Sequence, residues 1–136
     1  MLVNRSIPQC TVIPELSYPN MDDAINWLSA AFGFTLRVRI GDHRAQMNVG
    51  DGAVVLTEGF PKQSDTAHSV LVRVGDVNRH CAQAREAGAK IVHEPADHPF
   101  GERQCTVEDL VGRRWTFSQS IADVAPEGWG GVSSRL

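Results

Sequence analysis

An internal repeat constrains this chain more than any other feature, because the same order of elements can be followed twice along its 136 residues. Each half contains an extended apolar run, a turn with Asn or Asp, an amphipathic stretch and a glycine that ends this stretch. Residues 12–34 match residues 69–90 in this way, with Gly33 and Gly88 at equivalent points. A repeat of this size predicts two copies of one supersecondary unit, and it favours a binding site between the copies.

Local patterns assign the elements within each copy. Apolar residues recur at helical spacing after Pro19, Asn20 or Asp22 can cap this helix, and Gly33 can end it. Asp76 can cap the second helix. Apolar runs bounded by turn residues predict the strands. We expect these strands at residues 11–18, 35–40, 45–49, 53–58, 68–74, 90–93, 104–107 and 114–119, with a loop at residues 94–102.

The resulting order of one strand, one helix and three strands makes each copy a βαβββ module. We divide the chain into an N-terminal lead-in at residues 1–10, a first module at residues 11–66 and a second module at residues 67–120. Residues 121–136 are predicted to form an irregular C-terminal tail, because they are rich in Gly, Ser and Pro.

Composition excludes several classes of protein. The net charge is −3 and no basic stripe is present, which argues against a nucleic-acid partner. No apolar run could span a bilayer, and the N-terminus has no signal-peptide pattern. The three cysteines form no CxxC pair and no disulfide framework, and Cys81 and Cys105 are interpreted as buried small residues. These features predict a cytoplasmic protein without a membrane partner.

Four segments carry motifs of a known family. They are AINWLSAAFGF at residues 24–34, NVGDGAVVL at residues 48–56, DVNRHCAQAREAGAKIVHEP at residues 76–95, and PFGERQCTVEDLVGRRWTFSQ at residues 99–119. Together they resemble the vicinal oxygen chelate superfamily, which includes glyoxalase I, bleomycin-resistance proteins, fosfomycin-resistance enzymes and extradiol dioxygenases. The resemblance covers residues 10–120. It implies an α+β fold in which two tandem βαβββ modules form curled mixed sheets around a cavity, with the helices outside.

The resemblance also implies where a metal would bind. Catalytic members of the superfamily hold a divalent ion with His and Glu side chains from the first and last strand of each module, and the ion polarises substrate oxygens. The equivalent positions in this chain are Ile13, Leu56, Ser69 and Thr116. None of these four is a usual metal ligand. We therefore expect no metal cofactor.

Strand alternation predicts which side chains face the cavity. Trp115 and Phe117 must face the helices, so Arg114 and Thr116 face inward. Apolar walls with a few charges are typical of a small-molecule pocket. The ligand-binding residues predicted from this pattern are Glu15, Leu56, Glu58, Ser69, Arg73, Arg103, Arg114 and Thr116.

Two alternatives to ligand contact remain open for the charged residues of this set. Glu15 and Arg73 occupy related positions in the two repeats and could pair with each other. Arg103 could clamp an anionic ligand at the mouth of the cavity, or it could form a salt bridge with Glu102 or Asp109.

Three functions are compatible with these residues. The leading hypothesis is a bleomycin-resistance-like protein, expected to be a homodimer, that binds a small organic molecule without metal catalysis and so confers antibiotic resistance. The alternative is a metal-dependent glyoxalase-like lyase or isomerase, or a dioxygenase, with ligands drawn from Glu58, His68, His93 and His98. The third is an interaction module that acts through a sheet edge or its tail. No catalytic residue is legible from spacing.

Overall fold

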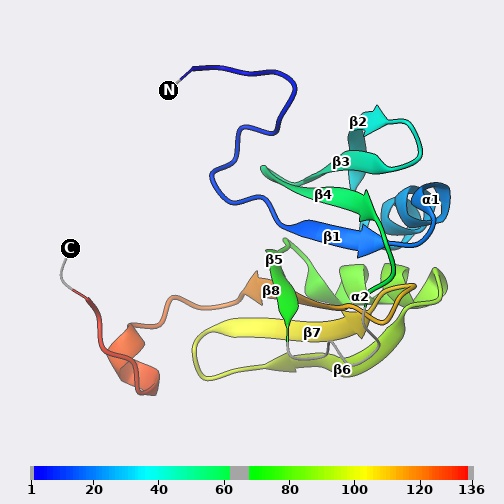
Figure 1. The fold of residues 1–136 in the computed structure, drawn as a ribbon. Helices are drawn as coiled ribbons and strands as arrows, with labels where there is room; N and C mark the ends of the chain where they lie inside the picture. Colours follow the sequence, from blue (N-terminus) through cyan, green and yellow to red (C-terminus); the bar gives the residue numbers. More distant parts are fainter. Residues whose placement is uncertain (1, 62–67, 135–136) are drawn as a thin grey trace.

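In the computed structural model, which describes residues 2–61 and 68–134, each repeat forms a four-stranded mixed sheet with one helix (Figure 1). The first module consists of β1 (Glu15–Tyr18), α1 (Met21–Phe32), β2 (Thr35–Ile40), β3 (Arg44–Val49) and β4 (Gly52–Glu58). The second consists of β5 (Ser69–Arg73), α2 (Val77–Glu86), β6 (Lys90–Asp97), β7 (Glu102–Glu108) and β8 (Arg114–Ser120).

The two sheets have the same topology. Their strand orders are β1-β4-β3-β2 and β5-β8-β7-β6. In each sheet the first strand pairs in parallel with the last, and the remaining pairs are antiparallel. The predicted α+β fold of two tandem βαβββ modules is therefore confirmed. The predicted boundary at residues 66 and 67 lies outside the described residues.

The helix ends agree with the sequence signals. The Asn20 side chain accepts a hydrogen bond from Asp23 N at 3.0 Å, and the Asp76 side chain accepts one from Arg79 N at 3.1 Å. Gly33 ends α1 with a φ of 74°, a left-handed conformation that costs glycine little. Within residues 2–61 and 68–134, no helix is both long and apolar enough to cross a membrane.

The strand boundaries differ most from the prediction in β1 and β6. β1 begins only at Glu15, because Pro14 has no N–H to donate to a neighbouring strand. β6 continues to Asp97 and β7 begins at Glu102, so the prediction of a loop at residues 94–102 is wrong for residues 94–97 and 102. The strand tolerates Pro95 because β6 is an edge strand whose pairing shifts between His93 and Ala96.

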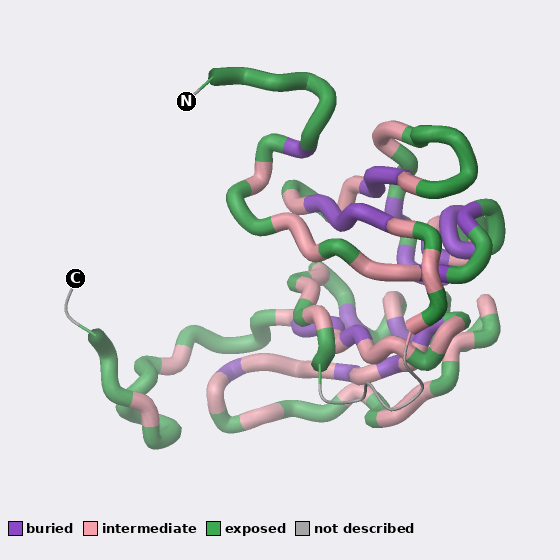
Figure 2. Tube along the Cα trace, in the orientation of Figure 1, coloured by how far each residue is buried: buried purple, intermediate pink, exposed green. Residues whose placement is uncertain are grey.

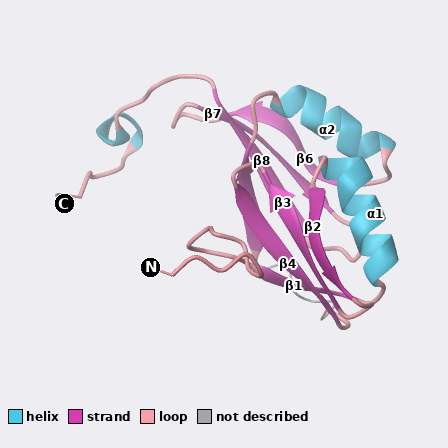
Figure 3. Cartoon of the chain, turned by 90° about the horizontal axis from the view of Figure 1, so that it is seen from above, coloured by secondary structure: helices cyan, strands magenta, loops and turns pink. Residues whose placement is uncertain are grey.

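Both helices cover the same side of the two sheets. Buried residues gather where the helices meet the strands (Figure 2), and Figure 3 shows α1 and α2 side by side with the strands beneath them. Trp27 Nε1 on α1 donates to Ala87 O at 2.9 Å, and Gln83 Nε2 on α2 donates to Ala30 O at 3.0 Å. We call the side of each sheet that no helix covers its open face.

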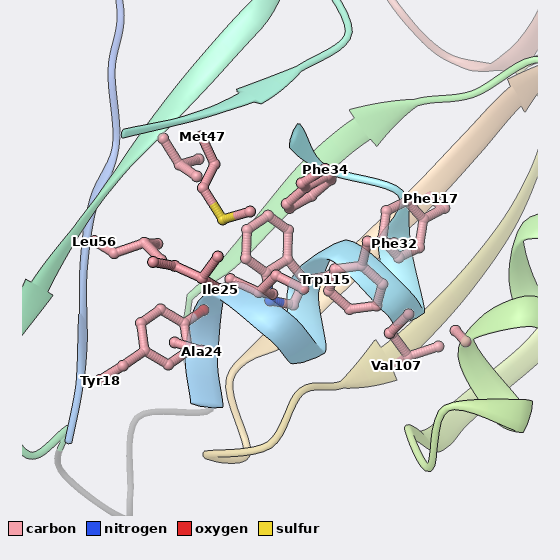
Figure 4. Close-up of a cluster of buried hydrophobic side chains, with 14 of the residues drawn as sticks. Tyr18, Ala24, Ile25, Phe32, Phe34, Met47, Leu56, Val107, Trp115 and Phe117 are labelled. Atoms are coloured by element: carbon pink, nitrogen blue, oxygen red, sulfur yellow. The ribbon is translucent and has the colours of Figure 1, made fainter. Parts of the chain in front are cut away.

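One core is shared by the two modules. The Phe32 ring lies 4.9 Å from the Phe117 ring and 5.4 Å from that of Trp115, measured between ring centroids (Figure 4). Phe34 lies 5.3 Å from Trp115. Each of these aromatic side chains contributes about 1.5–3 kcal/mol through burial. Because the rings come from both repeats, this packing fixes one module against the other.

A buried carboxylate joins the modules a second time. Asp109 Oδ2 accepts hydrogen bonds from Tyr18 OH at 2.7 Å and from Trp115 Nε1 at 3.0 Å. Its Oδ1 accepts from the backbone N–H groups of Val111 and Arg113, both at 3.0 Å. The Arg113 guanidinium lies 4.7 Å from the centre of the Tyr18 ring. Tyr18 belongs to the first module and the other residues to the second, so this network holds the two open faces in a fixed relation.

Candidate functional site

Strand pairing places four of the predicted residues on the open face of the second sheet. Trp115 and Phe117 of β8 are fully buried beneath the helices, so Arg114 and Thr116 between them point the other way. The register then adds neighbours from β5, because Ser69 pairs with Arg114, Leu71 with Thr116, and Arg73 with Ser118. The predicted facing of Ser69, Arg73, Arg114 and Thr116 is therefore observed. Their contact with a ligand stays a prediction.

Two groups of side-chain hydrogen bonds link β7 to β8 on this face. The hydroxyl oxygens of Thr106 and Thr116 lie 2.9 Å apart. Gln104 Nε2 donates to Ser118 Oγ at 3.0 Å, and Ser118 Oγ donates to Glu102 Oε1 at 2.7 Å. Because these partners hold one another, the polar groups keep fixed positions on the sheet.

Glu102 is charged in this network. Hydrogen bonds from the hydroxyls of Ser120 and Ser118 lower the pKa of its carboxyl, and the positive charge of Arg73 lowers it further. Arg73 Nη1 in turn donates to Ser120 Oγ at 3.3 Å. The Glu102 carboxylate and the Arg73 guanidinium therefore lie close together on this face, where the Ser120 hydroxyl joins them.

Arg114 and Leu71 form the other part of this face. Arg114 Nε lies 3.9 Å from Glu108 Oε1, and it is buried without a hydrogen-bond partner among the described residues. Leu71 stands between Arg73 and Arg114 in the register and is 64% exposed. An exposed aliphatic side chain between two guanidinium groups suits a ligand with an apolar body and acceptor oxygens.

The facing predicted for Leu56 is wrong. Leu56 is fully buried and belongs to the core with Tyr18 and Ile25, on the side that the helices cover (Figure 4). The register gives the reason: Leu56 pairs with Leu16, as Phe117 pairs with Val72 in the second module. Leu56 is therefore the counterpart of Phe117, and Val55 is the counterpart of Thr116. A shift of one residue in a strand reverses every side chain.

The facing predicted for Glu58 is wrong for the same reason, because Glu58 shares a side of β4 with Leu56. It pairs with Tyr18 and so lies on the helix side of the sheet, at the end of β4. There it lines a polar hollow of about 220 Å³ together with Asp22 and Arg39. Glu58 therefore lies on the helix-covered side of its sheet, whereas the other predicted residues Ser69, Arg73, Arg114 and Thr116 lie on an open face.

The remaining charged candidates have partners of their own. Glu15 Oε1 accepts a hydrogen bond from Arg44 Nη2 at 2.9 Å, whereas Arg73 bonds to Ser120. Arg103 Nε and Nη2 donate to the two carboxylate oxygens of Asp97 at 2.6 and 3.3 Å. The alternatives left open, a pairing of Glu15 with Arg73 and of Arg103 with Glu102 or Asp109, are therefore not observed. Arg103 also alternates with Gln104 and so lies off the open face.

Two hollows lie along the sheets. One, of about 300 Å³, is lined by residues of both modules, including Pro14, Val54, Leu71 and Trp115, so it lies between the β3–β4 turn and β5. The other, of about 430 Å³, lies over β6 and β7 and is lined by His93, His98, Gln104 and Thr106, among others. β7 was expected as a strand at residues 104–107, but none of its side chains was among the predicted ligand-binding residues except Arg103. The alternation of Glu102, Gln104, Thr106 and Glu108 with buried Cys105 and Val107 could have revealed them.

The fold and the sequence agree on a family. Residues 7–117 match the sequence profile of the Glyoxalase/Bleomycin resistance protein/Dioxygenase superfamily. The chain belongs to this superfamily. The crystal structure of TioX from Micromonospora sp. ML1 is similar, with 34% sequence identity, a TM-score of 0.69, and an alignment covering 79% of this chain and 96% of TioX.

More distant members of the superfamily share the fold alone. A glyoxalase/bleomycin resistance protein from Streptomyces sp. CB03234 is 24% identical, with a TM-score of 0.61 over 79% of this chain and all of that protein. The fosfomycin resistance protein FosX from Mesorhizobium loti is 11% identical, with a TM-score of 0.67 over 83% of this chain and 93% of FosX. No curated protein sequence matches the chain.

The superfamily's metal positions hold side chains that do not fit a divalent ion. The resemblance assigned these positions to Ile13, Leu56, Ser69 and Thr116, and the register puts Val55 in place of Leu56 on the open face. Two aliphatic groups and two neutral hydroxyls lack the imidazole or carboxylate donors that such an ion requires. Among residues 2–61 and 68–134, no three His, Cys, Asp or Glu side chains gather closely enough to hold a metal.

Proposed function

We propose that this protein binds a small organic molecule on the open face of the second sheet, in the manner of a bleomycin-resistance protein, and that binding does not require a metal. The observation that carries the proposal is Leu71, which is 64% exposed on the edge strand β5, next to β8 and β7, whose polar side chains are held in place by hydrogen bonds. Exposed apolar area beside ordered polar groups is characteristic of ligand sites.

The chemistry of this face defines the ligand class. Leu71 offers an apolar contact, Arg73 and Arg114 offer donors, and the Thr106–Thr116 pair offers hydroxyl groups. A ligand with a planar or aliphatic body and anionic or carbonyl oxygens would satisfy all three. The buried Arg114 Nε, which has no hydrogen-bond partner among the described residues, favours such an oxygen because an unpaired buried donor is costly.

The sheet alone leaves such a ligand partly in water, so we include a second copy of the chain in the proposal. A homodimer would lay another surface over the open face and close the site. The protein would then act in the cytoplasm by sequestering a compound, as in antibiotic resistance. Proteins that share this fold are described as a fosfomycin resistance protein and a glyoxalase/bleomycin resistance protein, and this likeness supports the proposal.

The site can be tested with anilinonaphthalene sulfonate, a fluorescent probe that combines apolar rings with an anion, and the function with bleomycin. Replacing Leu71 by Ser should weaken probe binding about tenfold, because the apolar contact is worth about 1–2 kcal/mol. Ile40→Ser is the matched control, since Ile40 is an exposed aliphatic residue on β2, far from this face.

Unchanged probe binding by the Leu71→Ser variant would reject the site. Calorimetry with bleomycin tests the drug, and sedimentation velocity tests the dimer. Stoichiometric metal in the purified protein, with an activity that a chelator abolishes, would instead favour the metal-dependent enzyme.

A further inference from the structure

The open face of the first sheet is covered by the chain itself. Residues 4–7 form a β-turn in which Ile7 N donates to Asn4 O at 3.4 Å. The Asn4 side chain reinforces the turn, because its Oδ1 accepts from Ser6 N at 3.1 Å. We call these residues the N-terminal turn. Figure 3 shows the N-terminal segment on the side of the sheets opposite the helices.

Two side chains of the sheet bind the central carbonyls of this turn. Arg37 Nη2 donates to Arg5 O at 2.9 Å, and Gln46 Nε2 donates to Ser6 O at 2.9 Å. Arg37 Nη1 also donates to Gln46 Oε1 at 2.5 Å, which locks the two side chains together. Both contacts to the turn go to backbone oxygens. The two donors therefore recognise the backbone conformation of the turn, and they make no hydrogen bond to its two central side chains.

The positions of Gln46 and Arg37 in the sheet direct both donors to the open face. Gln46 lies between Ala45 and Met47, both buried beneath the helices, so its side chain points to the open face. A β-bulge in β2 sets two residues, Arg37 and Val38, opposite this one residue of β3. Gln46 is only 4% exposed. With the turn in place this buried amide needs an acceptor, and the Ser6 carbonyl supplies it.

We propose that Arg37 and Gln46 form a recognition site for a peptide β-turn, and that the N-terminal turn is an internal occupant that competes with a peptide ligand. The rest of the segment is held weakly. Pro8 is buried, but Leu2 is 93% exposed and Val3 is 71% exposed (Figure 2). A segment tied by two side-chain hydrogen bonds and one buried proline can be displaced without unfolding the core. This inference does not rest on the proposed small-molecule site.

The test uses the full-length chain and a fluorescent synthetic peptide, acetyl-VNRSIP-amide, which copies residues 3–8. Pro8→Gly loosens the internal turn but leaves both donors intact. It should therefore raise peptide affinity about tenfold over the unaltered chain, because the tethered competitor is weakened. Fluorescence anisotropy measures binding. A spin label on Cys10, which is half-buried whereas Cys81 and Cys105 are buried, should gain mobility as the peptide displaces the segment.

The donors are tested in the Pro8→Gly background. Adding Gln46→Leu should lower peptide affinity about tenfold, the worth of one hydrogen bond from a buried amide. Gln46→Glu keeps the side-chain shape but cannot donate to the carbonyl, so it should lose affinity similarly and serves if the leucine variant fails to fold. Gln83→Leu is the matched control, because Gln83 also donates to a backbone carbonyl but lies on α2.

Three results would overturn the proposal. The Pro8→Gly variant could bind the peptide no more tightly than the unaltered chain does. The Gln46 variants could retain its affinity. A peptide in which Asn is replaced by Ala, and which therefore lacks the Asx contact that preforms the turn, could bind equally well. Leu71→Ser should leave peptide binding unchanged, which separates this site from the one on the second sheet.

Discussion

Tyr18 gives the sharpest test of how the two modules are joined, because it is the only tyrosine in the chain. Its side chain is fully buried, and its hydroxyl donates to Asp109 Oδ2 at 2.7 Å. Burial first, and then the negative charge of Asp109, raise the pKa of Tyr18 well above its ordinary value, although nearby Arg113 opposes the shift. We expect the folded protein to show no phenolate absorbance at about pH 10, where a free tyrosine is half ionised.

The raised pKa makes stability depend on pH in a defined direction. Below the unfolded pKa of about 10, Tyr18 is protonated in both states and its contribution is complete. As pH rises further, only the unfolded chain loses the proton, so the free energy of unfolding falls. The loss from this group is about 1.4 kcal/mol at about pH 11, and it grows by about 1.4 kcal/mol per pH unit until the folded pKa is reached.

Tyr18→Phe isolates this term. At neutral pH the variant should be less stable by about 1.5–3 kcal/mol, because it lacks a hydrogen bond to a charged acceptor. Since phenylalanine does not ionise, the stability difference from the unaltered protein should shrink by about 1.4 kcal/mol at about pH 11. Urea denaturation of both proteins across this range measures it. A phenolate band with an ordinary midpoint in the folded protein, or a constant difference between the two proteins, would refute the reasoning.

Three further predictions follow from contacts in the described residues. Asp109→Asn should destabilise the protein by about 2–4 kcal/mol in urea denaturation, because both carboxylate oxygens accept hydrogen bonds and the NH₂ group that replaces one of them can accept none. A loss below about 1 kcal/mol would contradict the network. Gly101→Ala should make the C-terminal tail more sensitive to limited proteolysis, because φ at Gly101 is +84° and an added Cβ would lie 2.5 Å from Ala122 O. Gly75→Ala is the control and should not change the cleavage, because nothing lies within 4 Å of the added Cβ. Burial raises the pKa of the Cys105 thiol to about 12, so a disulfide reagent at about pH 8 should modify Cys10 quickly in the native protein and the two buried thiols only after unfolding.

The fold could be predicted from the sequence because the signals that define its helices and strands lie close together along the chain. Asn20 and Asp76 cap the two helices through contacts three residues away, and the repeat supplied the topology by requiring both halves to fold alike. β8 was also assigned correctly. Its Arg114–Ser120 segment alternates polar residues with buried Trp115 and Phe117, so the sequence itself shows which face is inward.

The same reasoning failed in β4 for a physical reason. Residues 53–56 are Ala, Val, Val and Leu, and all four are buried. The helices cover Val54 and Leu56, while Val55 on the open face is also buried, so the strand shows no alternation of polar and apolar residues. Without that alternation, facing depends on the pairing of Leu56 with Leu16, which only the folded register reveals. Arg103 was misassigned similarly, because its pairing with Asp97 requires β6 to extend beyond Pro95.

The corrected register shows that the two repeats have diverged on their open faces while keeping equivalent cores. Leu56 and Phe117 occupy matching core positions, but Val55 and Gln46 stand where the second module has Thr116 and Thr106. One face therefore buries an amide beneath a turn of its own chain, whereas the other exposes Leu71 among hydroxyl and guanidinium groups. Because core residues set the frame and open-face residues meet ligands, substitutions at Gln46 and Leu71 should alter binding at separate sites. Substitutions at Leu56 or Phe117 should instead lower stability by about 2–5 kcal/mol.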